Sequence, residues 1–124
     1  MIYGVGTDII EIERVANAIK NPRFISRVYS KEEQSYCAVK SPQTYAGLFA
    51  AKEAAVKSIG IGLGRFQLNE VEILHDASGK PMVNPRGAFA ILCSENRWGF
   101  FISISHCKTT AAATAVAVIS DMPE

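Results

Sequence analysis

The long helical pattern at residues 43–59 constrains the fold of this chain more than any other feature. Its interior is rich in Ala, Leu, Lys and Glu, which all form helices readily. Gly60, Gly62 and Gly64 follow directly and predict the end of the helix and a flexible loop. Strand patterns elsewhere in the chain supply a sheet, and we expect this helix to pack on it.

The other elements are short and of mixed type. Strands are predicted at 2–8, 70–75, around Met82 and Val83, 99–106 and 111–119, the last two forming a hairpin. Helical patterns are predicted at 12–19, 24–28, 31–39 and 86–96, the third opened by a Ser30–Glu33 capping box. The order predicts one α+β domain over residues 1–124, with the long helix packed on a small, mostly antiparallel sheet.

Composition fits an ordinary globular domain. The chain has 124 residues, of which 48% are hydrophobic and 20% charged. No apolar run is long enough to span a bilayer and no targeting segment is apparent, so we expect a cytoplasmic protein without a membrane partner. The three cysteines are widely spaced and odd in number, which disfavours a disulfide framework and predicts reduced thiols, at least two of them buried.

Two carboxylates carry the strongest chemical signal. Asp8 ends the apolar opening MIYGVGTD, and Glu53 lies between Lys52 and Lys57 on the long helix. Carboxylates, lysines and a glycine-rich loop suit Mg²⁺ and a phosphate, because Mg²⁺ prefers one or two carboxylates plus phosphate oxygens. Two structural interpretations stay open. Asp8 fits a helix cap, and Glu53 with Lys57 fits a surface ion pair.

The charge is +1 overall but unevenly spread. Arg14, Arg23 and Arg27 lie in a stretch with no acid between Glu13 and Glu32. Such a stretch indicates either a solvated helix face or a dock for an acidic protein. Nucleic acid is disfavoured as a partner, because the chain is nearly neutral and the stretch has few aromatic residues.

His106 ends the SISH strand, next to Cys107. A histidine at the end of a strand is more often structural than catalytic. Neighbouring strand residues point to opposite faces, which disfavours a Cys–His nucleophile.

Three segments resemble the signatures of the holo-acyl-carrier-protein synthases, the small phosphopantetheinyl transferases. They are YGVGTDIIEIERV, FAAKEAAVKSIGIG and SISHCKTTAAATAVAV. The connecting segments RVYSKEEQSYC and VEILHDASGKPMV are similar to that family in the same order, so the resemblance covers almost the whole chain.

The resemblance implies a transfer of 4′-phosphopantetheine from coenzyme A to a serine of apo acyl carrier protein, in support of fatty acid biosynthesis. The second product is adenosine 3′,5′-bisphosphate. It implies that Asp8 and Glu53 hold Mg²⁺ at the pyrophosphate and that Lys57 meets a phosphate oxygen. The resemblance also implies that coenzyme A contacts five residues: Lys57, Gly60, Gly62, Ser105 and His106.

The resemblance further implies a homotrimer with active sites between subunits, and carrier docking on Arg14, Arg23 and Arg27. One position departs from the family pattern: Leu48 stands where an arginine is common before FAAKEA, and Lys40 or Arg65 are candidates to replace its contact. The residues leave open the general base, the accepted carriers and the use of acyl-coenzyme A. Two other functions also stay open, a non-catalytic trimeric module that binds an anionic ligand or acidic protein and a metal-dependent phosphohydrolase.

Overall fold

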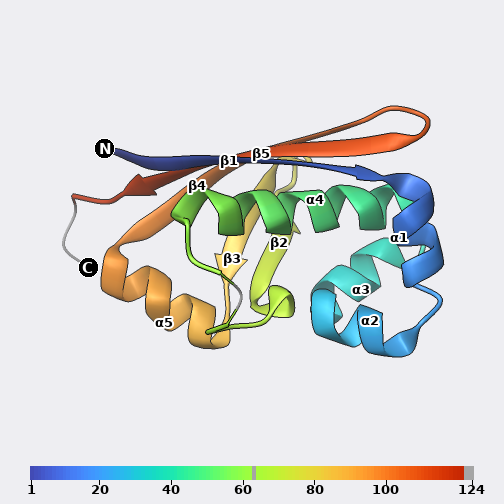
Figure 1. The fold of residues 1–124 in the computed structure, drawn as a ribbon, viewed down its shortest axis with the longest axis horizontal. Coiled ribbons are helices and arrows are strands. Elements are labelled where there is room, and N and C mark those ends of the chain that lie inside the picture. Colours follow the sequence, from blue (N-terminus) through green and yellow to red (C-terminus); the bar gives the residue numbers. More distant parts are fainter. Residues whose placement is uncertain (63, 122–124) are drawn as a thin grey trace.

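A computed structural model describes residues 1–62 and 64–121 of the chain. One long helix, α4 (Pro42–Ile59), runs along the middle of the molecule beneath a three-stranded sheet (Figure 1). The remaining elements in chain order are β1 (Ile2–Glu11), α1 (Ile12–Ala18), α2 (Pro22–Val28), α3 (Lys31–Cys37), a 3₁₀ turn (Leu68–Glu70), β2 (Val71–His75), β3 (Pro81–Pro85), α5 (Gly87–Asn96), β4 (Trp98–His106) and β5 (Thr110–Ile119).

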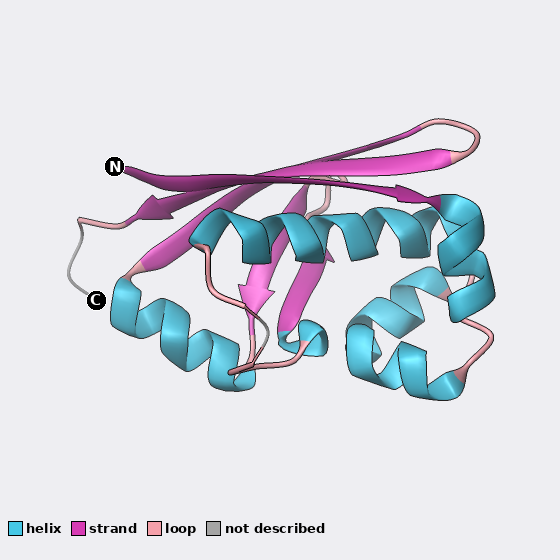
Figure 2. Cartoon of the chain, viewed as in Figure 1, coloured by secondary structure: helices cyan, strands magenta, loops and turns pink. Residues whose placement is uncertain are grey.

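The three-stranded sheet is antiparallel, in the order β1-β5-β4. The predicted hairpin is confirmed as β4 and β5. Figure 2 shows this sheet along one side of the molecule, with the helices gathered on its other side. Along β5, alternate alanines are buried against the helical side: Ala111, Ala113, Ala115 and Ala117. Small side chains let the helix lie close to the sheet, which confirms the predicted packing of the long helix.

Two glycines of β1 allow the closest contact with α4. A Cβ added to Gly6 would lie 2.1 Å from the carbonyl oxygen of Ala54, and one added to Gly4 would lie 2.1 Å from that of Ser58. Real atoms cannot approach so closely. Any larger residue at either position therefore forces β1 and α4 apart.

The strands do not form the single small sheet that the sequence predicts. Within the described residues, β2 and β3 pair with each other and with no other strand, as a separate two-stranded antiparallel sheet. A buried ion pair connects this second sheet to α4. Lys52 Nζ lies 2.6 Å from Glu33 Oε1, and it donates to the carbonyls of Leu68 and Val71 at 3.0 and 2.8 Å. Glu33 Oε2 accepts from the backbone of Ile73 at 2.7 Å.

Element boundaries differ from the predictions in one place that matters. β1 continues to Glu11 instead of ending at Asp8, so Asp8 lies inside a strand and is no helix cap. The Ser30–Glu33 capping box is confirmed, although its helix ends at Cys37. Cys37 and Cys93 are buried and Cys107 is exposed, as free thiols.

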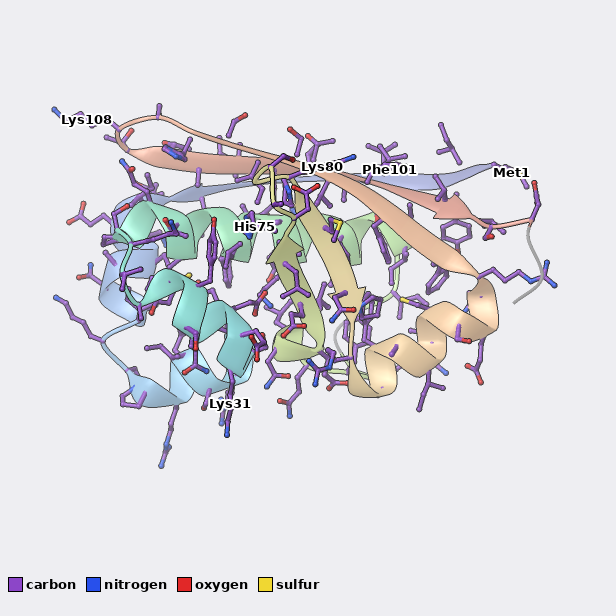
Figure 3. The ribbon with its side chains drawn as sticks, turned by 180° about the vertical axis from the view of Figure 1, so that it is seen from behind. Met1, Lys31, His75, Lys80, Phe101 and Lys108 are labelled. Carbon is purple, nitrogen blue, oxygen red and sulfur yellow. The ribbon has the colours of Figure 1, made fainter. Side chains whose placement is uncertain are left out.

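The outer face of the three-stranded sheet exposes large apolar side chains. They include Val5, Ile9 and Phe101, which are 59%, 71% and 61% exposed. Phe101 projects from this face in Figure 3. In the part of the chain that is described, no helix is long and apolar enough to cross a membrane.

Candidate functional site

Asp8 and Lys57 meet where β1 crosses the last turn of α4. Asp8 follows Gly6 by two residues, so it shares the strand face that packs on the helix. Lys57 Nζ lies 3.0 Å from Asp8 Oδ1 and donates to the carbonyl of Thr7 at 3.1 Å. The Asp8 side chain is 14% exposed and that of Lys57 is 54% exposed. The close approach at Gly6 therefore creates a contact between residues far apart in sequence.

Glu53 lies one helical turn before Lys57 and is half-buried. Burial raises the pKa of this carboxyl, the negative charge of Asp8 raises it further, and Lys57 opposes both effects. The two carboxylates are therefore near enough to repel. The alternative of a Glu53–Lys57 ion pair, left open by the sequence, is not what forms: Lys57 pairs with Asp8, and Glu53 has no hydrogen-bond or ion-pair partner in the described residues.

This donor set fits a magnesium ion shared with a phosphate ligand. Among the described residues, no group of three or more His, Cys, Asp or Glu could hold a metal on its own. Two neighbouring carboxylates with a half-exposed lysine beside them suit Mg²⁺, which takes one or two carboxylates and completes its shell with water and phosphate oxygens. Asp8 and Glu53 are the residues that would hold it.

Lys52 does not belong to this site, although it directly precedes Glu53. It is fully buried in the contact with Glu33, on a different side of α4. No signal close to it in the sequence indicates this role, because its partner is nineteen residues away in α3. Its neighbour Leu48 is also buried, 1% exposed, and belongs to the hydrophobic core.

The glycine-rich loop begins three residues after Lys57. Gly60 ends α4 with a φ of 71°, a left-handed conformation that glycine adopts without strain. Gly60 and Gly62 are exposed, and a Cβ on either would meet no atom of the described residues within 4 Å. The loop is therefore open to a ligand held at Lys57. Leu63, in the same predicted loop, lies outside the described residues.

His106 and Ser105 do not join Asp8 and Glu53 within one chain. Ile104 packs against Gly47 of α4, so His106, two residues further along β4, shares that face and Ser105 points to the outer face. His106 lines a cavity of about 400 Å³ whose helical wall includes Thr44 and Gly47. Thr44 and Glu53 are nine residues apart, about two and a half turns, and so lie on opposite sides of α4.

The three candidate docking arginines are exposed. Arg14 lies on α1, and Arg23 and Arg27 lie four residues apart on α2. No ion pair involves them in the described part of the chain. Their side chains are free to meet an acidic surface. Lys40 and Arg65 are exposed as well, and Lys40 Nζ lies 4.9 Å from the ring centre of Tyr36.

Comparisons with known proteins agree over nearly the full length. The family model of the 4′-phosphopantetheinyl transferase superfamily matches residues 4–117. A holo-[acyl-carrier-protein] synthase of Alkaliphilus metalliredigens is 46% identical over 121 residues, with 94% of this chain and 99% of the relative covered. One from Clostridium botulinum is 44% identical over 119 residues, covering 94% and 97%.

Solved structures match as well. The acyl carrier protein synthase of Plasmodium yoelii with ADP bound has a TM-score of 0.87 and 33% identity, covering 98% of each chain. The holo-(acyl-carrier-protein) synthase of Bacillus anthracis in complex with CoA (3′,5′-ADP) has a TM-score of 0.81 and 31% identity, covering 97% of this chain and 99% of the other.

Proposed function

The chain belongs to the 4′-phosphopantetheinyl transferase superfamily, and we propose that it is a magnesium-dependent holo-acyl-carrier-protein synthase. The serine hydroxyl of an apo carrier attacks the pantetheine-side phosphorus of coenzyme A. The bond to the nucleotide phosphate breaks, and adenosine 3′,5′-bisphosphate leaves. The observation that carries the proposal is the meeting of Asp8, Glu53 and Lys57 at one crossing point.

Each residue of this cluster has a part suited to phosphoryl transfer. Asp8 and Glu53 would hold Mg²⁺, which supplies positive charge to the pyrophosphate. Lys57 is largely exposed on the same helical face, where its amine can meet a phosphate oxygen. Negative charge grows on the leaving phosphate as its bond breaks, and a lysine placed there stabilises the transition state more than the substrate. Gly60 and Gly62 leave room for the ligand beside it.

The complete coenzyme A site is shared between protomers of a homotrimer. His106 lies across α4 from Glu53, so a ligand that touches both requires two chains. The exposed apolar side chains on the outer sheet face supply an association surface, with Ser105 on that same face. Light scattering at micromolar concentration should give the mass of three chains, and a monomer would contradict the shared site.

The carrier docks on Arg14, Arg23 and Arg27. Unpaired exposed charges of one sign speed the encounter with an acidic protein, and salt weakens that effect. Arg14→Glu should therefore raise the KM for the carrier and flatten its salt dependence, with little change in the KM for coenzyme A. The reverse pattern would assign this surface to the cofactor.

We place the reaction in the cytoplasm, as a step that supports fatty acid biosynthesis.

The decisive experiment is the intact mass of an apo carrier after incubation with the protein, coenzyme A and Mg²⁺. We expect a gain of one phosphopantetheine, lost when the metal is chelated. The same reaction without carrier tests for a phosphohydrolase, which would release products from coenzyme A alone. Binding of coenzyme A without any product in either mixture would indicate a non-catalytic module and contradict the proposal.

A further inference from the structure

The ammonium group of Lys52 is fixed in place by three hydrogen-bond acceptors. Its Nζ lies 2.6 Å from Glu33 Oε1, 3.0 Å from the carbonyl oxygen of Leu68 and 2.8 Å from that of Val71. An ammonium group has three donors, so all of them are used. The acceptors come from α3, the 3₁₀ turn and β2, and the Lys52 side chain is fully buried. This one side chain therefore ties α4 to three other elements.

The carboxylate of Glu33 is fixed as firmly. Besides the contact with Lys52, its Oε1 accepts from the backbone of Ser30 at 2.8 Å, and its Oε2 accepts from the backbone of Ile73 at 2.7 Å. Val71 and Ile73 both lie on β2, so Lys52 and Glu33 together cover backbone groups along the edge of β2 that does not pair with β3. We call Lys52 and Glu33 the buried pair.

The buried pair and β1 hold α4 from different sides. β1 approaches the helix at Gly6, where an added Cβ would lie 2.1 Å from the carbonyl oxygen of Ala54. Successive residues of an α-helix are about 100° apart around its axis, so Lys52 lies about 200° from Ala54. Figure 1 shows α3 on the other side of α4 from the three-stranded sheet. Contacts on two nearly opposite sides leave the helix little freedom to rotate about its axis.

The position of Glu53 depends on that rotation. Glu53 lies between Lys52 and Ala54 in the sequence, about 100° around the helix from each. Its carboxylate has no hydrogen-bond or ion-pair partner among the described residues, so no contact of its own fixes it beside Asp8. The backbone of α4 sets its place instead. A rotation of the helix displaces the carboxylate more than the backbone, because the carboxylate lies further from the helix axis.

We propose that Lys52 and Glu33 are positioning residues of the transfer reaction, because they fix the rotation of α4 and so hold the Glu53 carboxylate where it and Asp8 can bind one Mg²⁺. The proposal rests on the proposed function, in which those two carboxylates hold the metal. The buried pair touches neither metal nor substrate and acts through Glu53. Loss of groups that orient metal ligands typically lowers metal affinity or activity about 10- to 100-fold.

The test measures metal affinity separately from stability. The main variant is Lys52→Met/Glu33→Gln, which removes both charges with little change in volume. Free Mn²⁺ has an electron paramagnetic resonance signal that is lost on binding. Titration of the intact protein with Mn²⁺ and coenzyme A, corrected for coenzyme A alone, therefore gives the affinity and the number of sites. We expect an affinity about 10-fold lower in this variant, with the number of sites unchanged. The Mg²⁺ concentration for half-maximal transfer should rise by the same factor.

Tyr29→Phe is the matched control. The buried hydroxyl of Tyr29 donates to the carbonyl of Tyr45 at 2.8 Å, and Tyr45 lies on α4 about two turns before Glu53. This variant also loses a buried contact of α4, so it should lower stability while Mn²⁺ affinity stays at the wild-type value. Circular dichroism identifies a temperature at which every variant is folded, because an unfolded fraction would lower the number of sites.

Wild-type Mn²⁺ affinity in the folded double variant overturns the proposal, and so does an equal fall in Tyr29→Phe. If the double variant does not fold, Glu33→Gln alone decides, because it leaves either Lys52 or the backbone of Ile73 without its acceptor. A lower Mn²⁺ affinity in that variant supports the proposal, and an unchanged one overturns it. Transfer to the carrier by the wild-type protein tests the proposed function without any of these variants, so the two failures can be told apart.

Discussion

The two lysines that flank Glu53 on α4 lie in opposite environments. Lys52 is fully buried, 2.6 Å from Glu33, and donates to two carbonyls as well. Lys57 is 54% exposed and lies 3.0 Å from Asp8 at the candidate site. In the buried pair every donor and acceptor is used within the chain. In the exposed set, formed by Asp8, Glu53 and Lys57, the carboxylate of Glu53 has no hydrogen-bond or ion-pair partner among the described residues, and it is therefore available to a ligand.

The largest expected effect is on the buried side of this comparison. Lys52→Met leaves the Glu33 carboxylate buried without its cation, which costs about 3–5 kcal/mol of unfolding free energy. Urea denaturation measures it. The double variant Lys52→Met/Glu33→Gln removes both charges and should recover part of the loss. A loss below about 1 kcal/mol in the single variant would show that the pair does not anchor α4.

Variants of Asp8 and Glu53 should show the opposite behaviour, with activity lost and stability kept. Asp8→Asn and Glu53→Gln should each lower the transfer rate about 100- to 1000-fold, because each removes one of the two carboxylates that we propose hold Mg²⁺. Their unfolding free energy should stay within about 1 kcal/mol of wild type. Glu13→Gln, an exposed carboxylate on α1, is the matched control and should keep full activity. Near wild-type rates for either site variant at saturating Mg²⁺ would remove the two-carboxylate site.

The contact between β1 and α4 should affect both stability and the geometry of the candidate site. Gly6→Ala places a Cβ 2.1 Å from the carbonyl of Ala54, where backbone has to move. We expect a loss of about 1–3 kcal/mol of stability, together with lower activity because Asp8 shifts relative to Glu53. Gly64→Ala is the control, since a Cβ there would meet no atom of the described residues within 4 Å. Equal stability and activity of the two variants would show that this close approach does not position the site.

Local patterns predicted the elements well, because their signals lie within a few residues. The Ser30–Glu33 cap and the hairpin of β4 and β5 are examples. The partners of charged groups were harder to predict. Helical spacing favoured Glu53 as the partner of Lys57, whereas the partner is Asp8, brought there by packing at Gly6. The burial of Lys52 depends in the same way on a helix distant in sequence.

The smallest predicted effect is the change of stability with pH that Glu53 causes. Its pKa is raised above the ordinary 4.5 by burial and by Asp8, so the folded protein holds this proton more tightly than the unfolded chain. Stability from this group is then lost as pH rises from the ordinary value through the raised one. Glu53→Gln should therefore be slightly more stable than wild type at pH 7 and should lose that advantage near pH 4.

Lys52→Met gives the opposing case in the same measurements, since it should be far less stable than wild type at pH 7. Thermal unfolding at both pH values compares the three proteins, and added Mg²⁺ should stabilise the wild type but not Glu53→Gln. A Glu53→Gln protein less stable than wild type at pH 7 would mean that this carboxylate already has its partner within the chain. The polar groups of Asp8, Glu53 and Lys57 would then all be paired within the chain, as those of Lys52 and Glu33 are. The difference in environment between the two lysines would no longer indicate a ligand site.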